Sequence, residues 1–188
     1  NKSDIKLQES KVYNIAKKYG GMKAGEENGI RGYFLTYMIA YLRDFGYNYS
    51  FMSESFETSV PWDKVLELCR NVKSRISEVS SHYQLKHEPF VSCRVTQTYD
   101  TGACVYFYFG ALWTGLDDPM ACFNHVEHAA RDEILKVGGS LSHHHGIGKL
   151  RKHWMKETVS NVGYQMLKGL KKSIDPTNIF ANNNLIDL

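Results

Sequence analysis

The sequence has little that would mark a membrane span or a nucleic-acid binder. Its longest apolar runs, such as residues 33–42, are too short to cross a bilayer, and Arg43 and Asp44 close that run. The net charge is only +3, which is too small to argue for nucleic acid. The chain therefore reads as a soluble globular protein, long enough at 188 residues to bury a core.

The cysteines are few and scattered, and no Cys-x-x-Cys pair is present, which argues against a zinc site. They are Cys69, Cys93, Cys104 and Cys122. Their helix-like and strand-like surroundings predict reduced core residues in a non-secreted protein. Because the chain starts at Asn1 without methionine, we interpret it as a fragment in which an N-terminal targeting signal would not be seen. Its end, residues 186–188, is not the Ser-Lys-Leu peroxisomal address.

Hydrophobic spacing and turn residues predict an alternation of helices and strands. Helices are expected at residues 6–19, 33–44 (largely buried and ended by Gly46), 65–82, 119–137 and 150–172; strands are expected at 47–56, 89–99, 103–112 and 140–143. Ser59 with Pro61 and Asp63 is a helix-start signal. The central order of strand–helix–strand–strand–helix–strand predicts an α+β fold with a ferredoxin-like (split β-α-β) antiparallel sheet.

The two central strands carry a polar pattern. In residues 91–99, alternate side chains point to opposite faces of the strand. One face is apolar, and the other carries hydroxyl groups and Arg94. Residues 100–102 fit a three-residue hairpin loop with Gly102 in the left-handed conformation. That register pairs Thr96 with Tyr106 and Arg94 with Tyr108. The simpler interpretation is a half-solvated sheet with ordinary threonine and tyrosine pairs.

Three consecutive histidines, His143, His144 and His145, follow the fourth expected strand. An extended backbone would point His143 and His145 one way and His144 the other. Buried histidines each need a partner and a defined tautomer. The run is open to three interpretations: an exposed loop, a metal site that lacks a nearby carboxylate or cysteine in the sequence, or acid–base chemistry near neutral pH.

Several segments together resemble the cap half of flavoproteins of the vanillyl-alcohol-oxidase family, and within it the synthases that form the ether bond of ether lipids. The segments are YMIAYLRD (37–44), ESFETSVPWDKVLELCRNVK (54–73), SCRVTQTYDTGACVYFYF (92–109), GGSLSHHHGIGKLRK (138–152) and DPTNIFANNNL (175–185). The resemblance implies a FAD-linked oxidase C-terminal domain whose N-terminal FAD-binding partner is missing. It divides the chain into a helical lead-in (1–46), a cap and substrate domain (47–149) and a C-terminal helix with a tail (150–188).

The chemistry implied by the resemblance is an exchange without net redox. Acyl-dihydroxyacetone phosphate would lose its fatty acid and gain a long-chain fatty alcohol through an adduct at flavin N5, with FAD as the cofactor and no metal. The resemblance also implies peroxisomal ether-lipid and plasmalogen synthesis, peripheral membrane association, a homodimer and no nucleic acid. The isolated piece is expected to be inactive.

The resemblance assigns roles residue by residue. Tyr106 matches the catalytic acid–base tyrosine, and His143, His144 and His145 match a histidine run required for activity. Arg43 matches the substrate-binding arginine, and Thr96 and Arg94 are expected to support the substrate pocket beside Tyr106. The tail that matches an activity-supporting segment consists of Asn182, Asn183, Asn184, Leu185 and Ile186.

Other functions remain open. A 2-hydroxy-acid oxidase or dehydrogenase of the same family would carry a similar cap, and the piece could be catalytically silent. Split β-α-β sheets also bind RNA, but residues 103–110 (ACVYFYFG) lack the leading basic residue and the glycines of that signature.

Overall fold

Two long helices make up the N-terminal part of the protein. The computed structural model describes residues 1–188, and helix α1 spans Lys2–Lys18. This helix confirms the one expected at residues 6–19. Its first turn is stabilised by a capping box, in which the side chains of Asn1 and Asp4 each bond the backbone of the other residue. Helix α2 spans Glu26–Asn48 and runs past Gly46, where we expected it to end. No residue of α2 is buried, so the expected burial of residues 33–44 is wrong. An apolar run predicts that another surface packs against the helix, but that surface must come from residues outside the run.

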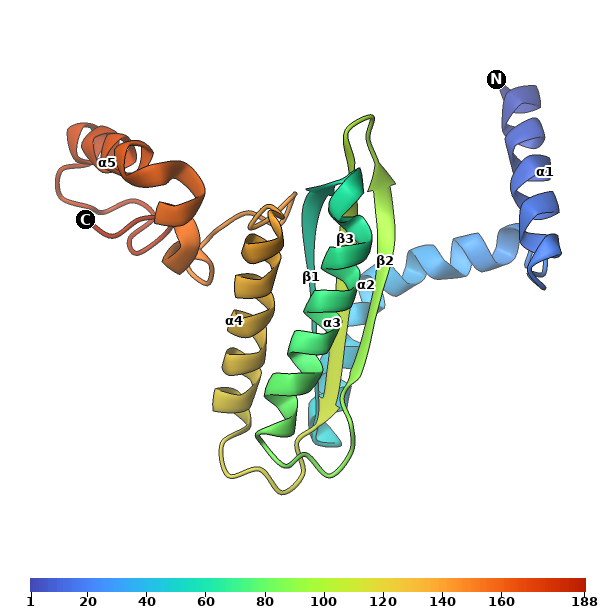
Figure 1. Ribbon diagram of the computed structural model, residues 1–188, viewed down its shortest axis with the longest axis horizontal. Helices are drawn as coiled ribbons and strands as arrows, with labels where there is room; N and C mark the ends of the chain where they lie inside the picture. Colours follow the sequence, from blue (N-terminus) through green and yellow to red (C-terminus); the bar gives the residue numbers. More distant parts are fainter. The chain divides into compact units, whose positions relative to one another are not determined.

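The chain divides into two units, residues 1–45 and residues 46–188, and the second unit contains the sheet (Figure 1). Strands β1 (Phe51–Pro61), β2 (Phe90–Thr98) and β3 (Gly102–Leu112) form an antiparallel sheet in the order β1-β3-β2. After a 3₁₀ turn at Trp62–Lys64, helix α3 spans Val65–Ser81 and lies beside α4, Pro119–Val137. This arrangement confirms the α+β class and the split β-α-β connection, in which β3 separates β1 from β2.

Three local expectations about this sheet are wrong. The first strand lies at residues 51–61 rather than 47–56, so Ser59 is a strand residue and does not cap the following helix. Residues 140–143 form no fourth strand, and the backbone bends at residues 141 and 143. Their polar backbone groups bond partly to side chains: the Ser140 carbonyl accepts from the Thr58 hydroxyl at 2.6 Å, and the His143 N–H donates to a carboxylate. In a strand, those backbone groups would instead bond the backbone of a neighbouring strand.

The core lies between one face of the sheet and the two helices. It is built by alternate strand residues and by one stripe of each helix, as period-2 and period-3.6 patterns require. Its buried members include Met52, Phe56, Val60, Val105, Phe107, Phe109, Leu68, Val72, Ile76, Val126, Ala130 and Ile134. Helix α4 begins at an Asp118 side-chain cap and ends at a left-handed Gly138, which confirms both expected boundaries.

The hairpin register differs from the expected one. Tyr99 N–H bonds the Gly102 carbonyl across a two-residue loop, and Gly102 is not left-handed; a side chain there would meet the Val60 carbonyl oxygen at 2.3 Å. A bulge between Val95 and Gln97 then shifts the ladder again. Arg94 therefore pairs with Tyr106, not with Tyr108. Because the two shifts add to two residues, Arg94 still lies on the same face as Tyr106.

The C-terminal residues return to the loop that follows α4. A short 3₁₀ helix (Lys152–Trp154) leads into α5 (Met155–Ile174), which confirms a helix in this region. The buried indole of Trp154 donates to Asp132 on α4 at 2.7 Å. In the tail, Leu185 N–H bonds the Gly148 carbonyl at 3.1 Å, and Ile186 is buried. None of the helices is long and apolar enough to cross a membrane.

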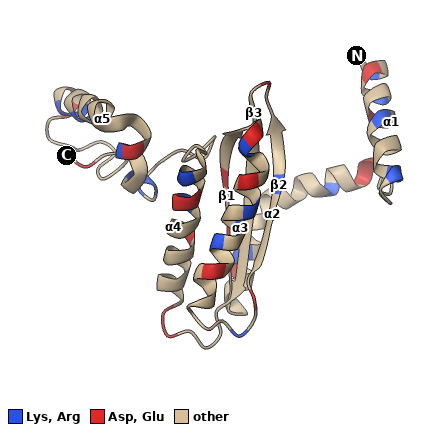
Figure 2. Cartoon of the chain, in the orientation of Figure 1, with Lys and Arg blue, Asp and Glu red and all other residues tan.

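Charged side chains lie mainly on the helices, and the strands carry few of them (Figure 2). The sequences of the three strands contain only Glu54, Glu57 and Arg94 as charged residues. Of these, Glu57 is 1% exposed. A buried carboxylate needs hydrogen-bond partners, and its partners define the site described next.

Candidate active site

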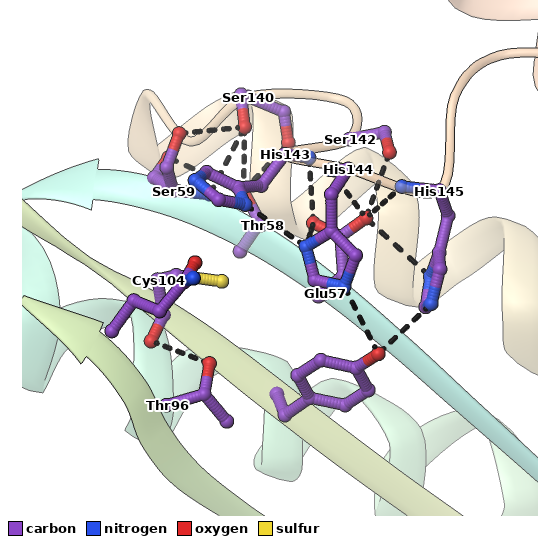
Figure 3. Close-up of polar contacts among 12 residues, drawn as sticks. Glu57, Thr58, Ser59, Thr96, Cys104, Ser140, Ser142, His143, His144 and His145 are labelled. Carbon is purple, nitrogen blue, oxygen red and sulfur yellow. Dashed lines mark hydrogen bonds and ion pairs between the residues drawn. The ribbon is translucent and has the colours of Figure 1, made fainter.

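The Glu57 carboxylate is surrounded by the loop that carries the three histidines (Figure 3). It accepts hydrogen bonds from the backbone N–H groups of His143 (2.5 Å), His144 (3.1 Å) and His145 (2.9 Å). The Ser142 hydroxyl adds a fourth bond at 2.8 Å. Successive backbone N–H groups that converge in this way form an anion-binding nest, here filled by a side chain of the same protein.

The hydrogen bonds keep Glu57 ionised. Burial alone would raise its pKa, but the bonds from the backbone of His145, the side chain of Ser142 and the backbone of His143 and His144 lower it, and the pKa is about 2. The carboxylate is therefore negatively charged at neutral pH. It is also the centre around which the backbone of residues 143–145 bends.

Further contacts hold the loop against strand β1 and helix α4. Ser140 N–H bonds the Ser59 carbonyl at 2.9 Å, and the Ser140 hydroxyl accepts from Ser59 N–H at 2.9 Å. The buried guanidinium of Arg131 donates to the Leu141 carbonyl at 3.2 Å and pairs with Glu127 at 2.6 Å. The backbone of the histidine run is therefore anchored, while His144 and His145 remain exposed, as the exposed-loop interpretation expected.

Tyr106 lies opposite Glu57 in the β1–β3 register, and its hydroxyl contacts two imidazoles. It lies 3.2 Å from His144 Nε2 and 2.9 Å from His145 Nε2. The structure thus brings together the expected catalytic tyrosine and two of the expected histidines. The expected alternation of the histidines is wrong: His143 instead contacts the Tyr99 hydroxyl, at 2.7 Å. The bend around Glu57 replaces the extended backbone on which the alternation depended.

The pKa shifts in this group favour neutral partners. Burial raises the pKa of Tyr106, and the Glu57 charge raises it further, which outweighs the opposite effect of Arg94. Burial lowers the pKa of His145, and the Glu57 charge offsets part of that shift. At neutral pH a neutral phenol thus faces a neutral His145, and a neutral phenol needs a partner that takes its proton before it can act as a base.

The two residues expected to support Tyr106 differ in their contacts. The Arg94 guanidinium lies 6.0 Å from the Tyr106 ring centre and 5.4 Å from that of Tyr108, so it belongs to the polar face. Thr96 lies in the bulge, and its hydroxyl bonds the Cys104 carbonyl at 3.4 Å. Thr96 therefore does not pair with Tyr106.

The remaining expected site residues lie elsewhere in the chain. Arg43 belongs to α2 in the first unit. The tail reaches Gly148, three residues after His145, and Asp187 N–H bonds the Tyr164 hydroxyl at 3.1 Å. Leu185 and Ile186 therefore lie beside the end of the histidine loop, whereas the other expected tail residues, Asn182, Asn183 and Asn184, are exposed.

Glu57 and Tyr99 are site residues that the sequence analysis missed. The expected first strand ended one residue before Glu57, so its place in the ladder was not seen. A signal was present: Glu57 lies in the stretch Phe56-Glu57-Thr58, where a carboxylate interrupts a strand pattern. Tyr99 was assigned only to the end of the hairpin.

One potential metal-ligand set lies in the same place. One ligand atom from each of Glu57, Cys104, His143 and His144 lies within 4.8 Å of the others. However, the Glu57 carboxylate already accepts four hydrogen bonds, and both histidines bond tyrosine hydroxyls. The expectation that no metal takes part stays a prediction.

Comparison with known families identifies the class of protein. Residues 4–185 match the family model described as FAD linked oxidases, C-terminal domain. The chain therefore belongs to this family, and its cofactor is FAD.

Individual relatives narrow the class and confirm the resemblance to ether-lipid-forming synthases. The chain is 50% identical to the alkyldihydroxyacetonephosphate synthase of Caenorhabditis elegans over 188 residues, which are all of this chain and 32% of that protein. It is 30% identical to the Trypanosoma brucei brucei synthase over 98% of this chain and 30% of that protein. A solved structure of an alkyldihydroxyacetonephosphate synthase, at 20% identity, matches 100% of this chain and 30% of that one with a TM-score of 0.60, which shows the same fold. The chain spans about a third of the length of the relatives it matches.

The sheet face that carries Tyr106 fits a flavin ring in its chemistry. The rings of Tyr106 and Tyr108 stack with centres 5.8 Å apart, and Arg94 lies over them. Flat aromatic rings with hydroxyl and guanidinium donors suit a planar heterocycle that carries carbonyl oxygens and ring nitrogens.

Proposed function

We propose that the protein containing this chain exchanges the acyl group of acyl-dihydroxyacetone phosphate for a long-chain fatty alcohol in ether-lipid synthesis, without net redox. The observation that carries this proposal is the contact of Tyr106 with both His144 and His145. Relatives over the whole chain are named alkyldihydroxyacetonephosphate synthase, which supports the same reaction.

The residues of this chain would handle the protons of the exchange. Removal of a proton next to the dihydroxyacetone carbonyl needs a base, and the Tyr106 oxygen can accept that proton once its own has passed to an imidazole. The charge on Glu57 holds the loop so that His144 and His145 stay within hydrogen-bond reach of the phenol. When bound, FAD supplies a ring nitrogen that can act as the nucleophile of the exchange; Arg94, Tyr106 and Tyr108 would hold its ring.

Two further roles belong to the same proposal. Arg43 would bind the phosphate of the substrate, because a planar guanidinium matches phosphate oxygens in pairs. The tail would support activity by holding residues 146–148, which follow the histidines directly. The partners would be the acyl substrate and the fatty alcohol, on a homodimer that associates peripherally with the peroxisomal membrane and binds no nucleic acid.

The test uses the full-length, FAD-bound protein with acyl-dihydroxyacetone phosphate and a radiolabelled long-chain alcohol. We expect label in alkyl-dihydroxyacetone phosphate, release of an equal amount of fatty acid, and no reduction of an added electron acceptor. A hydride-transferring relative would instead reduce the acceptor when a 2-hydroxy acid is added. That result, without incorporation of the alcohol, would contradict the proposal.

A further inference from the structure

A continuous chain of hydrogen bonds runs from Tyr106 through two histidines to a second tyrosine. Tyr106 contacts His144 Nε2 at 3.2 Å, and His144 Nδ1 lies 2.9 Å from His143 Nδ1. His143 Nε2 lies 2.7 Å from the Tyr99 hydroxyl. Each imidazole uses both of its ring nitrogens, one toward each neighbour, which is the arrangement that allows a ring to accept a proton on one side and release one on the other.

The donors and acceptors along this chain can be assigned consistently. The Tyr99 hydroxyl donates to Gln97 Oε1 at 3.1 Å, so it accepts from the Nε2–H of His143. The Nδ1 of His143 then accepts from the Nδ1–H of His144, whose Nε2 accepts from the Tyr106 hydroxyl. In every hydrogen bond of this chain the donor is therefore the group nearer to Tyr106. Each ring carries one N–H, so both rings are neutral.

The outer end of the chain opens into a cavity of about 730 Å³. Tyr99 and His143 line this cavity, together with the glycines Gly138 and Gly139 and with Thr158. Tyr99 itself is 46% exposed. Water in this space can accept a proton at the end of the chain, at a point separated from Tyr106 by two imidazoles.

We propose that His144, His143 and Tyr99 form a relay that carries the proton collected at Tyr106 to water in this cavity; the relay rests on the function proposed above. The Tyr106 proton passes to His144 Nε2, and the His144 Nδ1 proton passes to His143 Nδ1. The His143 Nε2 proton passes directly to water in the cavity, or to the Tyr99 oxygen as the Tyr99 hydroxyl proton leaves to that water. The Tyr106 oxygen then takes the proton from the substrate carbon. One proton enters, one leaves, and both rings end in the opposite tautomer. Reverse transfer resets the relay and returns a proton to the site.

The test is chemical rescue in the full-length, FAD-bound enzyme. His143→Ala interrupts the relay but leaves Tyr106 and both of its imidazole partners in place. We expect exchange of the substrate's carbon-bound proton with solvent to fall about 10²-fold, the lower end of general acid–base effects. Added imidazole, which fits the cavity, should restore the exchange in proportion to its concentration. Tyr99→Phe should lower the rate less, because water can still reach His143 from the cavity.

Tyr83 and His125 provide the matched control, because their hydroxyl and ring nitrogen also lie 2.9 Å apart, but in the turn that follows α3 and on α4. His125→Ala should neither slow the proton exchange nor respond to imidazole. If His143→Ala is slow but imidazole restores nothing, or if it is as fast as wild type while Tyr106→Phe is impaired, the relay is wrong and the proposed function stands. Full activity of Tyr106→Phe would overturn the proposed function and the relay with it.

Discussion

The Glu57 carboxylate accepts a hydrogen bond from the backbone N–H of His145 at 2.9 Å across a separation of 88 residues. This bond and its neighbours at His143 and His144 connect an edge strand to the loop that carries the acid–base groups. The positions of the imidazoles therefore depend on a residue that bonds their backbone N–H groups and also lies 3.4 Å from the Nδ1 atom of His145. A carboxylate suits this position because it accepts several hydrogen bonds and donates none.

We expect Glu57→Gln to release the histidine loop. The glutamine amide presents donors to backbone donors, and each buried N–H left without a partner costs roughly 1–3 kcal/mol. Amide hydrogen exchange of residues 142–146, measured by mass spectrometry in the full-length enzyme, should rise strongly, and turnover should fall by about 10²-fold. The matched control is Glu133→Gln, a similarly buried carboxylate on α4 that bonds Asn71. Unchanged protection of the loop in Glu57→Gln would show that the nest does not hold it.

The same carboxylate predicts a pH dependence of stability. Its pKa falls from 4.5 to about 2 on folding, so its stabilising effect is complete above pH 4.5 and is lost as the pH falls toward 2. The wild type should therefore lose about 3 kcal/mol in this window relative to a variant without the group. The measurement is the difference in thermal midpoint between wild type and Glu57→Gln at several pH values from 6 to about 2. A difference that stays constant over this range would contradict the assignment.

The features predicted correctly from the sequence are those set by local signals. Asp118 at the start of α4 and Gly138 at its end fix that helix through groups adjacent in the chain. The strands of the hairpin follow from alternation in residues 90–112. Arg94 and Tyr106 were correctly expected on the same face of the sheet although the expected register was wrong. The total shift was two residues, and side chains return to the same face of a strand every two residues.

The features that were missed depend on distant contacts. The bulge beside Thr96 and the close approach of Gly102 to Val60 on β1 involve pairing that no local pattern shows. The bend of residues 143–145 is set by Glu57, from another strand, so an extended backbone was the wrong expectation. Burial of α2 was inferred from its own residues, although burial depends on the surface that would cover them.

Arg43→Lys tests the phosphate anchor. An ammonium is a point charge and cannot reproduce the paired hydrogen bonds of a guanidinium. We expect kcat/KM for acyl-dihydroxyacetone phosphate to fall by about tenfold or more, since a charge-assisted hydrogen bond contributes roughly 1.5–3 kcal/mol. The flavin absorbance spectrum of the full-length enzyme should stay unchanged. Wild-type kcat/KM at subsaturating substrate would remove Arg43 from the site.

Ile186→Ala tests the role of the tail. Ile186 is buried, and truncation of a buried isoleucine costs about 2–5 kcal/mol, nearer the low end at a chain terminus that can relax. We expect faster amide exchange at residues 146–152, because the adjacent Leu185 holds the Gly148 carbonyl, and a parallel loss of turnover. Leu188→Ala is the matched control, since Leu188 is 41% exposed. If amide exchange at residues 146–152 rose while turnover stayed normal, the tail would not support activity.

The last prediction is that Tyr106 and His144 act in one step. Tyr106→Phe removes the hydroxyl that lies between His144 and His145, and it should lower turnover by roughly 10²–10⁴-fold with little change in the thermal midpoint. His144→Ala removes the acceptor to which that hydroxyl passes its proton. Because each change disables the same transfer, the double variant should lose far less than the product of the two single effects.

The measurement for this cycle is substrate-dependent exchange of the carbon-bound proton in the full-length enzyme, with Tyr83→Phe and His125→Ala as the matched pair away from the site. The raised pKa of Tyr106 keeps the phenol protonated at neutral pH, so it cannot act as a base until an imidazole takes its proton. This dependence is the physical reason for the expected coupling. Multiplicative losses in the double variant would mean that the tyrosine and the histidine act in separate steps.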